Sequence, residues 1–99
     1  DLRQACHRAV VTAVTQVARE ASDLTRRAAR LRAVAPKLRA KGSEDALALF
    51  LSRDAVAPAS LTSLRSGRAA RRFCDRLVKL GVARELTGRP TFRLYGIGP

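Results

Sequence analysis

The side chains of this chain that could do chemistry are mainly arginines, and they are densest between positions 65 and 93. That stretch holds nine basic residues and two acidic residues, a net charge of +7 in under a third of the chain. Guanidinium groups stay charged at any physiological pH and bind phosphate oxygens in pairs of hydrogen bonds. The concentration of positive charge therefore favours a polyanionic partner such as nucleic acid.

The spacing of these arginines predicts a two-faced helix over residues 67–80. Its apolar side holds Phe73, Cys74 and Leu77, while the opposite side is charged throughout. The charged side consists of Arg68, Arg71, Arg72, Asp75, Arg76 and Lys79. Ser66 is expected to cap the first turn, and Gly81 to end the helix in a left-handed conformation.

After this helix the apolar residues alternate with polar ones, which predicts a two-stranded hairpin over residues 82–95. The alternating positions are Val82, Leu86, Phe92 and Leu94. Gly88 and Arg89 are expected to form a two-residue turn. We expect Phe73, Leu77, Leu80 and Phe92 to form the core beneath the basic helix, and Asp75 to pair with Arg71, Arg72 or Lys79.

Other chemistry is sparse. Cys6 and Cys74 are too far apart in sequence to suggest a metal site, and His7, the sole histidine, has neither a nucleophile nor a ligand beside it. No glycine-rich phosphate loop or paired carboxylates are present, and no apolar run approaches the roughly 20 residues needed to cross a bilayer. We therefore expect no enzyme activity, metal, cofactor, small-molecule ligand or membrane span. Together with the strong positive charge, this predicts a cytoplasmic, nucleoid-associated protein.

The whole composition bounds the architecture. Ninety-nine residues make about one domain, and only four are aromatic, so the core should be built mainly from Leu, Val and Ala. The net charge is +12, but 17 of the 20 basic residues are arginine in an alanine-rich chain, a bias that GC-rich coding also produces. The expected fold class is mainly α with a small β wing.

The elements that must position the basic helix are expected between residues 43 and 66. Ser43, followed by Glu44 and Asp45, is a good helix start, and this helix should end near Arg53. Residues 55–57 are expected to form a short strand beside the hairpin, and residues 58–64 a second helix that Pro58 opens. The predicted domains are residues 1–42, an N-terminal helical segment, and residues 43–99.

The N-terminal segment contains no Gly or Pro from residue 2 to residue 35, which predicts helix throughout. Ser22 and Asp23 could divide it into two helices, and Pro36 should end it. Residues 37–41 would then form one basic turn. The arginine cluster of the N-terminal segment is interpreted as a solvated helix face rather than as a second nucleic-acid surface; its members are Arg26, Arg27, Arg30, Arg32 and Arg39.

This segment also carries a heptad pattern. Val10, Val17, Leu24, Leu31 and Leu38 recur every seven residues, with Val14, Ala21, Ala28 and Ala35 between them. Two interpretations remain open: the helices fold back on each other and on residues 46–51, which is slightly favoured, or the stripe binds a second copy. We predict a homodimer through residues 6–35.

Residues 43–99 resemble a winged helix-turn-helix domain of the bacterial regulator type. The segment RRFCDRLVKLGVARELTGR resembles an Arg-rich helix that ends at Leu-Gly-Val and passes into a wing carrying Gly-Arg, and TGRPTFRLYGI resembles the end of helix-turn-helix segments at the C-termini of uncharacterised proteobacterial proteins. The resemblance implies binding of double-stranded DNA, with a recognition helix over 67–80 and a wing over 82–95. The implied DNA-binding residues are Ser66, Arg68, Arg71, Arg72, Arg76, Lys79, Arg89 and Arg93.

The expected function is thus DNA binding in a bacterial transcriptional regulator or a mobile-element or plasmid protein. The alternative is a winged-helix module for protein interaction or assembly, which apolar residues on the basic face would favour. RNA is disfavoured because base recognition needs exposed aromatic side chains, and Tyr95 is the sole candidate for that role.

Overall fold

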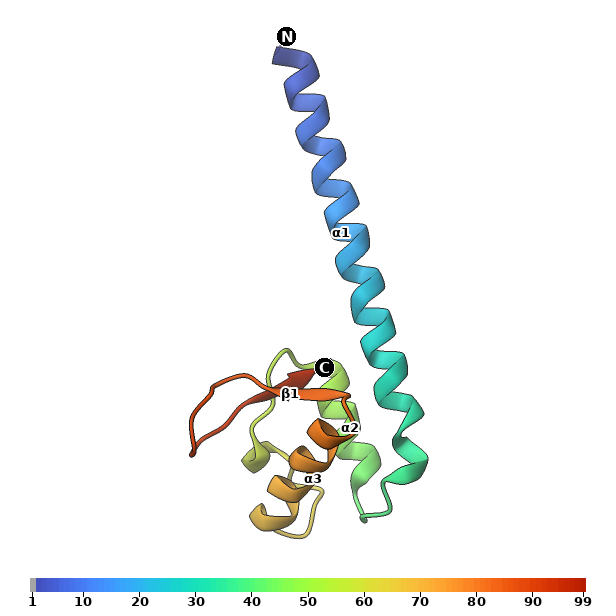
Figure 1. The fold of residues 1–99 in the computed structure, drawn as a ribbon. Helices are drawn as coiled ribbons and strands as arrows, with labels where there is room; N and C mark the ends of the chain where they lie inside the picture. The colour runs from blue at the N-terminus through green and yellow to red at the C-terminus, as the bar shows by residue number, and fades with distance from the viewer. Residues whose placement is uncertain (1) are drawn as a thin grey trace.

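The computed structural model describes residues 2–99, and it is mainly helical with one small antiparallel sheet, as the sequence predicts. The elements in chain order are α1 (Leu2–Ala33), η1 (Ala35–Lys37), α2 (Ser43–Ser52), η2 (Pro58–Ser60), α3 (Gly67–Lys79), β1 (Ala83–Glu85) and β2 (Tyr95–Ile97), where η marks a 3-10 turn. The molecule measures 61 × 29 × 20 Å, because α1 projects far beyond the other elements, which gather at its C-terminal end (Figure 1).

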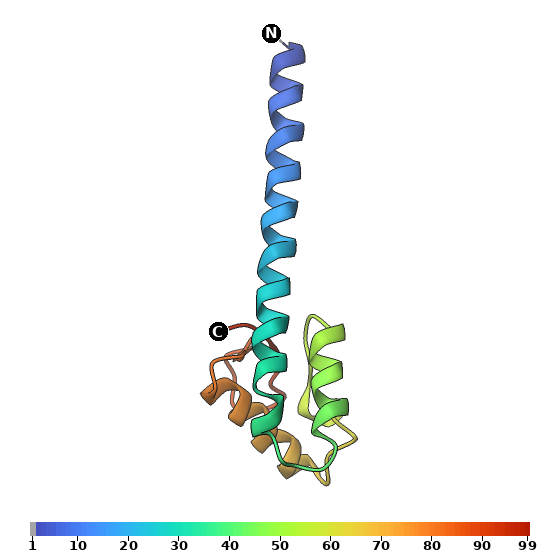
Figure 2. The same ribbon diagram turned by 90° about the vertical axis from the view of Figure 1, so that its right-hand side faces the viewer.

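Helix α1 runs without a break, so the prediction that its parts fold back on each other is wrong (Figure 2). Ser22 and Asp23 do not cap a second helix. Asp23 Oδ1 instead pairs with Arg26 Nη2 one turn later, at 2.6 Å, and the strong helix formers on both sides carry the helix through. Every residue from 2 to 26 is exposed.

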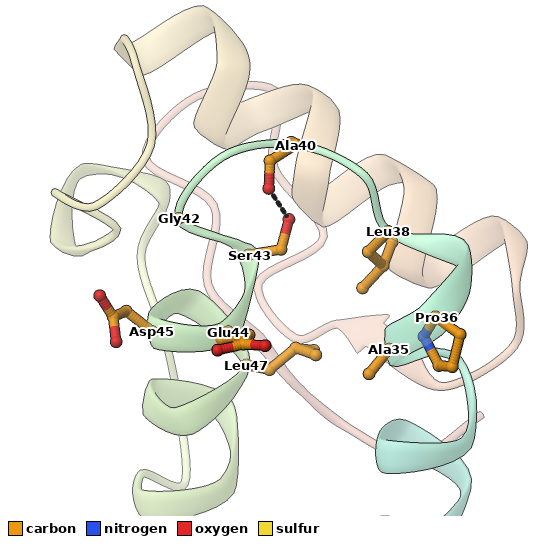
Figure 3. Close-up of a pocket in the computed structure, with 9 residues that line it drawn as sticks. All are labelled: Ala35, Pro36, Leu38, Ala40, Gly42, Ser43, Glu44, Asp45 and Leu47. Carbon is orange, nitrogen blue, oxygen red and sulfur yellow. Dashed lines mark hydrogen bonds between the residues drawn. The ribbon is translucent and has the colours of Figure 1, made fainter.

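A tight connection joins α1 to α2 and contains η1 (Figure 3). Gly42, with φ of +87°, occupies the N-cap position of α2. The sequence predicts that the Ser43 hydroxyl caps this helix, and that prediction is wrong, since Ser43 is the first helical residue and its Oγ donates to the carbonyl of Ala40 at 2.5 Å. Glu44 and Asp45 do lie in the first turn, where the helix dipole favours negative charge.

The core lies between the end of α1, α2, α3 and the sheet. Phe50 of α2 and Phe73 of α3 meet at its centre, with ring centroids 6.4 Å apart. Leu31 of α1 is fully buried in the same core, so the last turns of α1 are fixed to the rest of the molecule. The other buried apolar residues are Val34, Ala46, Leu47, Val56, Leu61, Leu64, Ala70, Cys74, Leu77, Val82, Ala83 and Tyr95.

The helix predicted over residues 58–64 does not form. Pro58 opens only the 3-10 turn η2, and irregular backbone follows to Ser66. Serine and threonine in this stretch compete for backbone hydrogen bonds, and Ser63 Oγ donates to the carbonyl of Gly42 at 2.8 Å. The segment is thus held to the start of α2 rather than in a helix.

The predicted hairpin forms, but with a long loop instead of a two-residue turn at Gly88 and Arg89. Strands β1 and β2 pair antiparallel with Ala83 opposite Ile97, and the loop between them spans residues 86–94. Val56 adds a single antiparallel bridge to Tyr95, where a short strand was expected.

Candidate nucleic-acid interface

The local signals that position α3 act as predicted. Ser66 Oγ accepts a hydrogen bond from the backbone N–H of Ala69 at 3.1 Å, and Gly81, with φ of +75°, follows the end of the helix. Ala70, Phe73, Cys74 and Leu77 are buried. The helix therefore has one face fixed in the core and the opposite face directed to solvent.

That outer face carries all five basic residues of α3, and each of them is exposed: Arg68, Arg71, Arg72, Arg76 and Lys79. Within residues 2–99, none of them forms an ion pair. The expected pairing of Asp75 with Arg71, Arg72 or Lys79 is therefore not present among the described residues. Five positive charges against the one negative charge of Asp75 leave this helix with a net charge of +4.

On one flank of α3, the loop between β1 and β2 brings the predicted wing residues close to the helix. Arg71 and Asp75 of α3 line an open hollow of about 720 Å³ together with Arg89 and Arg93 of the loop. Helix and loop thus form a continuous basic surface, although they are separated by a turn in the sequence. The structure brings these predicted site residues together.

The other flank of α3 holds basic residues that sequence reasoning did not assign to the site. Lys37 and Arg39, in the connection after α1, line a hollow of about 780 Å³ with Arg72 and Arg76. The sequence predicts a basic turn over residues 37–41 but gives it no role at the reading helix, and Arg39 is expected on a solvated face. Its place beside α3 depends on the long-range packing of α1, for which no local sequence signal exists.

The two wing arginines are engaged in ordering their own loop. Arg89 donates from Nε and Nη2 to the carbonyl of Phe92, at 3.0 and 2.7 Å, and Arg93 donates from Nε to the carbonyl of Arg89 at 2.8 Å. Glu85 closes the base of the loop by accepting from Thr87 Oγ1 and from the N–H of Gly88. These hydrogen bonds, first that of Thr87, lower the pKa of Glu85.

A family model described as "Protein of unknown function (DUF1403)" matches residues 1–97. The chain belongs to this family. The comparison with curated proteins gave no match, and neither did the comparison with solved structures. The family description names no activity.

Two aromatic side chains of this DUF1403 chain are placed opposite to expectation, while Phe73 lies in the core as predicted. Phe92, expected in the core, is 87% exposed, whereas Tyr95, proposed as a possible stacking surface, is 3% exposed. Leu86, also at an alternating position, is 42% exposed. The alternation fails because residues 86–94 form a loop and not a strand with one buried face. A backbone hydrogen bond from the Leu86 N–H to the Leu94 carbonyl, at 2.7 Å, closes the loop, and the Glu85 carboxylate accepts from Thr87 and Gly88 within it.

Neither cysteine of the DUF1403 chain is part of a disulfide. Cys74 is fully buried on the inner face of α3, and burial, reinforced by the Asp75 carboxylate, raises the pKa of its thiol to about 12. Cys6 is exposed on α1. Within residues 2–99 no group of three His, Cys, Asp or Glu side chains is placed to hold a metal ion, and no helix is both long and apolar enough to span a bilayer.

Proposed function

We propose that this chain binds duplex DNA, with α3 as the reading helix and the loop of residues 86–94 as a wing. The order of elements supports this proposal: α2, the Val56 bridge, η2, α3 and the β1–β2 hairpin follow in the sequence of a winged helix-turn-helix. The helix before α3 is reduced to η2, so α3 would contact DNA with less support from a preceding helix than in a full helix-turn-helix.

The observation that carries the proposal is the set of basic side chains of α3, exposed and without ion pairs among the described residues. Arginines that serve only solubility are commonly interspersed with acidic residues, and here the flanking segments add Lys37, Arg39, Arg89 and Arg93 instead. Thirteen residues of α3 give a length of about 20 Å, enough to lie in a major groove about 12 Å wide.

Binding measured over a salt series tests the proposal. If about five phosphates are neutralised, the logarithm of the association constant should fall with the logarithm of salt concentration with a slope of about −4 to −5. Replacing Arg71 by Gln should reduce the magnitude of this slope by about one. The control Arg8→Gln, on the projecting part of α1, should leave the slope unchanged. A flat salt dependence, or no binding at low salt, contradicts the proposal.

A second candidate function, assembly with another protein chain, is favoured by α1. Val10, Val14, Val17 and Leu24 follow the heptad pattern and are 53% to 64% exposed. Leu31, the next member of the pattern, is buried in the core of its own chain. We propose that a second copy covers this stripe, along Val10 to Leu24 instead of the whole of residues 6–35, and that the homodimer presents two α3 helices to one duplex.

A further inference from the structure

We propose that Phe92 is an aromatic wedge that enters the base stack of a bound duplex from the wing loop. This inference rests on the proposed DNA binding and adds a contact to the bases that the basic face of α3 does not provide. Phe92 is 87% exposed, the most exposed large apolar side chain among the described residues. Because the ring is not buried when the chain folds, it contributes almost no hydrophobic stabilisation to the folded state.

The backbone at Phe92 holds the ring in this position at a cost. Phe92 has φ of +52°, and it is the one non-glycine residue with positive φ among residues 2–99. A bulky side chain rarely adopts this conformation, and such outliers concentrate at functional sites. The two hydrogen bonds from Arg89 to the Phe92 carbonyl, and the one from Arg93 to the Arg89 carbonyl, fix the loop around it.

The surroundings of Phe92 favour nucleic acid over a membrane or an apolar protein groove. The hollow that Phe92 lines also contains Arg71, Arg89 and Arg93, with Asp75 as the one acidic residue. A single aromatic ring provides little apolar area for insertion into a bilayer. In duplex DNA, by contrast, bases lie directly between two rows of phosphates, so an exposed ring set among arginines is complementary to both.

The wedge also predicts which sequences bind best. Apolar side chains that enter from the minor groove separate adjacent base pairs and bend the duplex. Steps from pyrimidine to purine, TA above all, unstack most easily. With α3 in the major groove and the wing beside it, Phe92 should therefore select a TA or CA step next to the segment that α3 contacts.

The experiment compares the parent chain with Phe92→Ala, Phe92→Trp and a remote control, Leu2→Ala, whose side chain is 81% exposed at the start of α1. Each protein is titrated against duplexes that carry 2-aminopurine at a single TA step. The affinity, its slope against salt concentration and the 2-aminopurine fluorescence are measured. The parent, Phe92→Trp and Leu2→Ala should increase the fluorescence through unstacking. Phe92→Ala should remove that increase and weaken binding about 10-fold at unchanged salt slope.

The outcomes separate the wedge from DNA binding itself. If Phe92→Ala binds and unstacks the duplex as the parent does, the wedge is refuted while DNA binding stands. If the parent binds no duplex at low salt, DNA binding and the wedge both fail. A Phe92-dependent affinity that occurs only with single strands, or only with phosphatidylserine vesicles, also refutes the wedge.

Discussion

Arg89 and Arg93 differ from the arginines of α3 in what their guanidinium groups already bind. Arg89 uses Nε and Nη2 on the Phe92 carbonyl, whereas Arg93 uses Nε on the Arg89 carbonyl and also forms a hydrogen bond with the Tyr95 side chain. Both arginines therefore order the loop, Arg89 at the Phe92 carbonyl and Arg93 between the Arg89 carbonyl and Tyr95. The sequence placed both arginines in the wing but could not distinguish these roles, because they depend on the loop conformation.

Within α3, we predict that Arg72 determines sequence preference more than Lys79 does. The first half of a recognition helix meets base edges, while its last residues meet the DNA backbone. Arg72→Ala should erase discrimination between a selected site and random DNA, and Lys79→Ala should weaken binding to both alike. Competition gel shifts measure the two ratios, and equal losses of discrimination would show that the assignment is wrong.

Cys74 predicts a loss of stability at alkaline pH. The thiol of the unfolded chain ionises near its ordinary pKa of 9.0, but in the folded chain burial raises that pKa to about 12. The free energy of unfolding should be unaffected below pH 9 and should fall between pH 9 and pH 12, at up to about 1.4 kcal/mol per pH unit. Tyr95, whose pKa burial also raises, acts in the same direction.

Denaturant unfolding at several pH values between 8 and 12 measures this effect. Cys74→Ala should make the decline shallower and leave only the contribution of Tyr95. In the native chain at pH 8, iodoacetamide should modify the exposed Cys6 and spare Cys74. A parent and a Cys74→Ala variant with the same pH dependence would contradict the assignment.

Among the elements, α3 was predictable because its signals are local. The cap at Ser66, the glycine at its end and its buried face all lie within the helix or next to it. The prediction of a helix over residues 58–64 was wrong because Ser63 Oγ donates a hydrogen bond to the carbonyl of Gly42, 21 positions away. The short turn at Gly88 was wrong because the Glu85 carboxylate, and not a strand partner, takes the Gly88 N–H.

The connection between the elements depends on Gly42, and we predict that Gly42→Ala is strongly destabilising. Its φ of +87° is unfavourable for a side chain, and a Cβ there would lie 2.1 Å from the Ser63 carbonyl oxygen. We expect a loss of about 2 kcal/mol or more in the free energy of unfolding. Chemical denaturation measures it, with Gly67→Ala as the matched control, because a Cβ at Gly67 meets only Arg71 Nη1 at 3.5 Å.

On the scale of the whole molecule, the sequence showed the heptad stripe but not what covers it. An apolar stripe has the same sequence pattern whether it packs within one chain or between two chains. Only the path of α1 in the folded chain shows which residues of the stripe are buried and which are exposed. That path takes Leu31 into the core and leaves Val10 to Leu24 exposed. The position of residues 37–41 beside α3 follows from the same path of α1. It could not be predicted from the local sequence, because it depends on long-range packing.

We predict that charge on the stripe abolishes the proposed homodimer. At micromolar concentration the parent should have about twice the chain mass, whereas a variant with both Val14→Asp and Val17→Asp should have the mass of the monomer. Thr12→Asp, on the opposite face of the exposed part of α1, should leave the dimer intact. Sedimentation equilibrium distinguishes these results, and a monomeric parent would refute dimerisation. Leu31 is unsuitable as a test position, since a charge there would disrupt the core.

The long projection of α1 also means that its amide hydrogens should not exchange with solvent as one unit. From Leu2 to Arg26 every residue is exposed, so in a lone chain only the helical backbone bonds protect these amides. Opening is then most frequent in the part of α1 far from the core and becomes rarer toward Leu31, where it requires unfolding of the core. Amide exchange along α1 should thus form a gradient in a single chain, and protein concentration should flatten that gradient if a second copy binds.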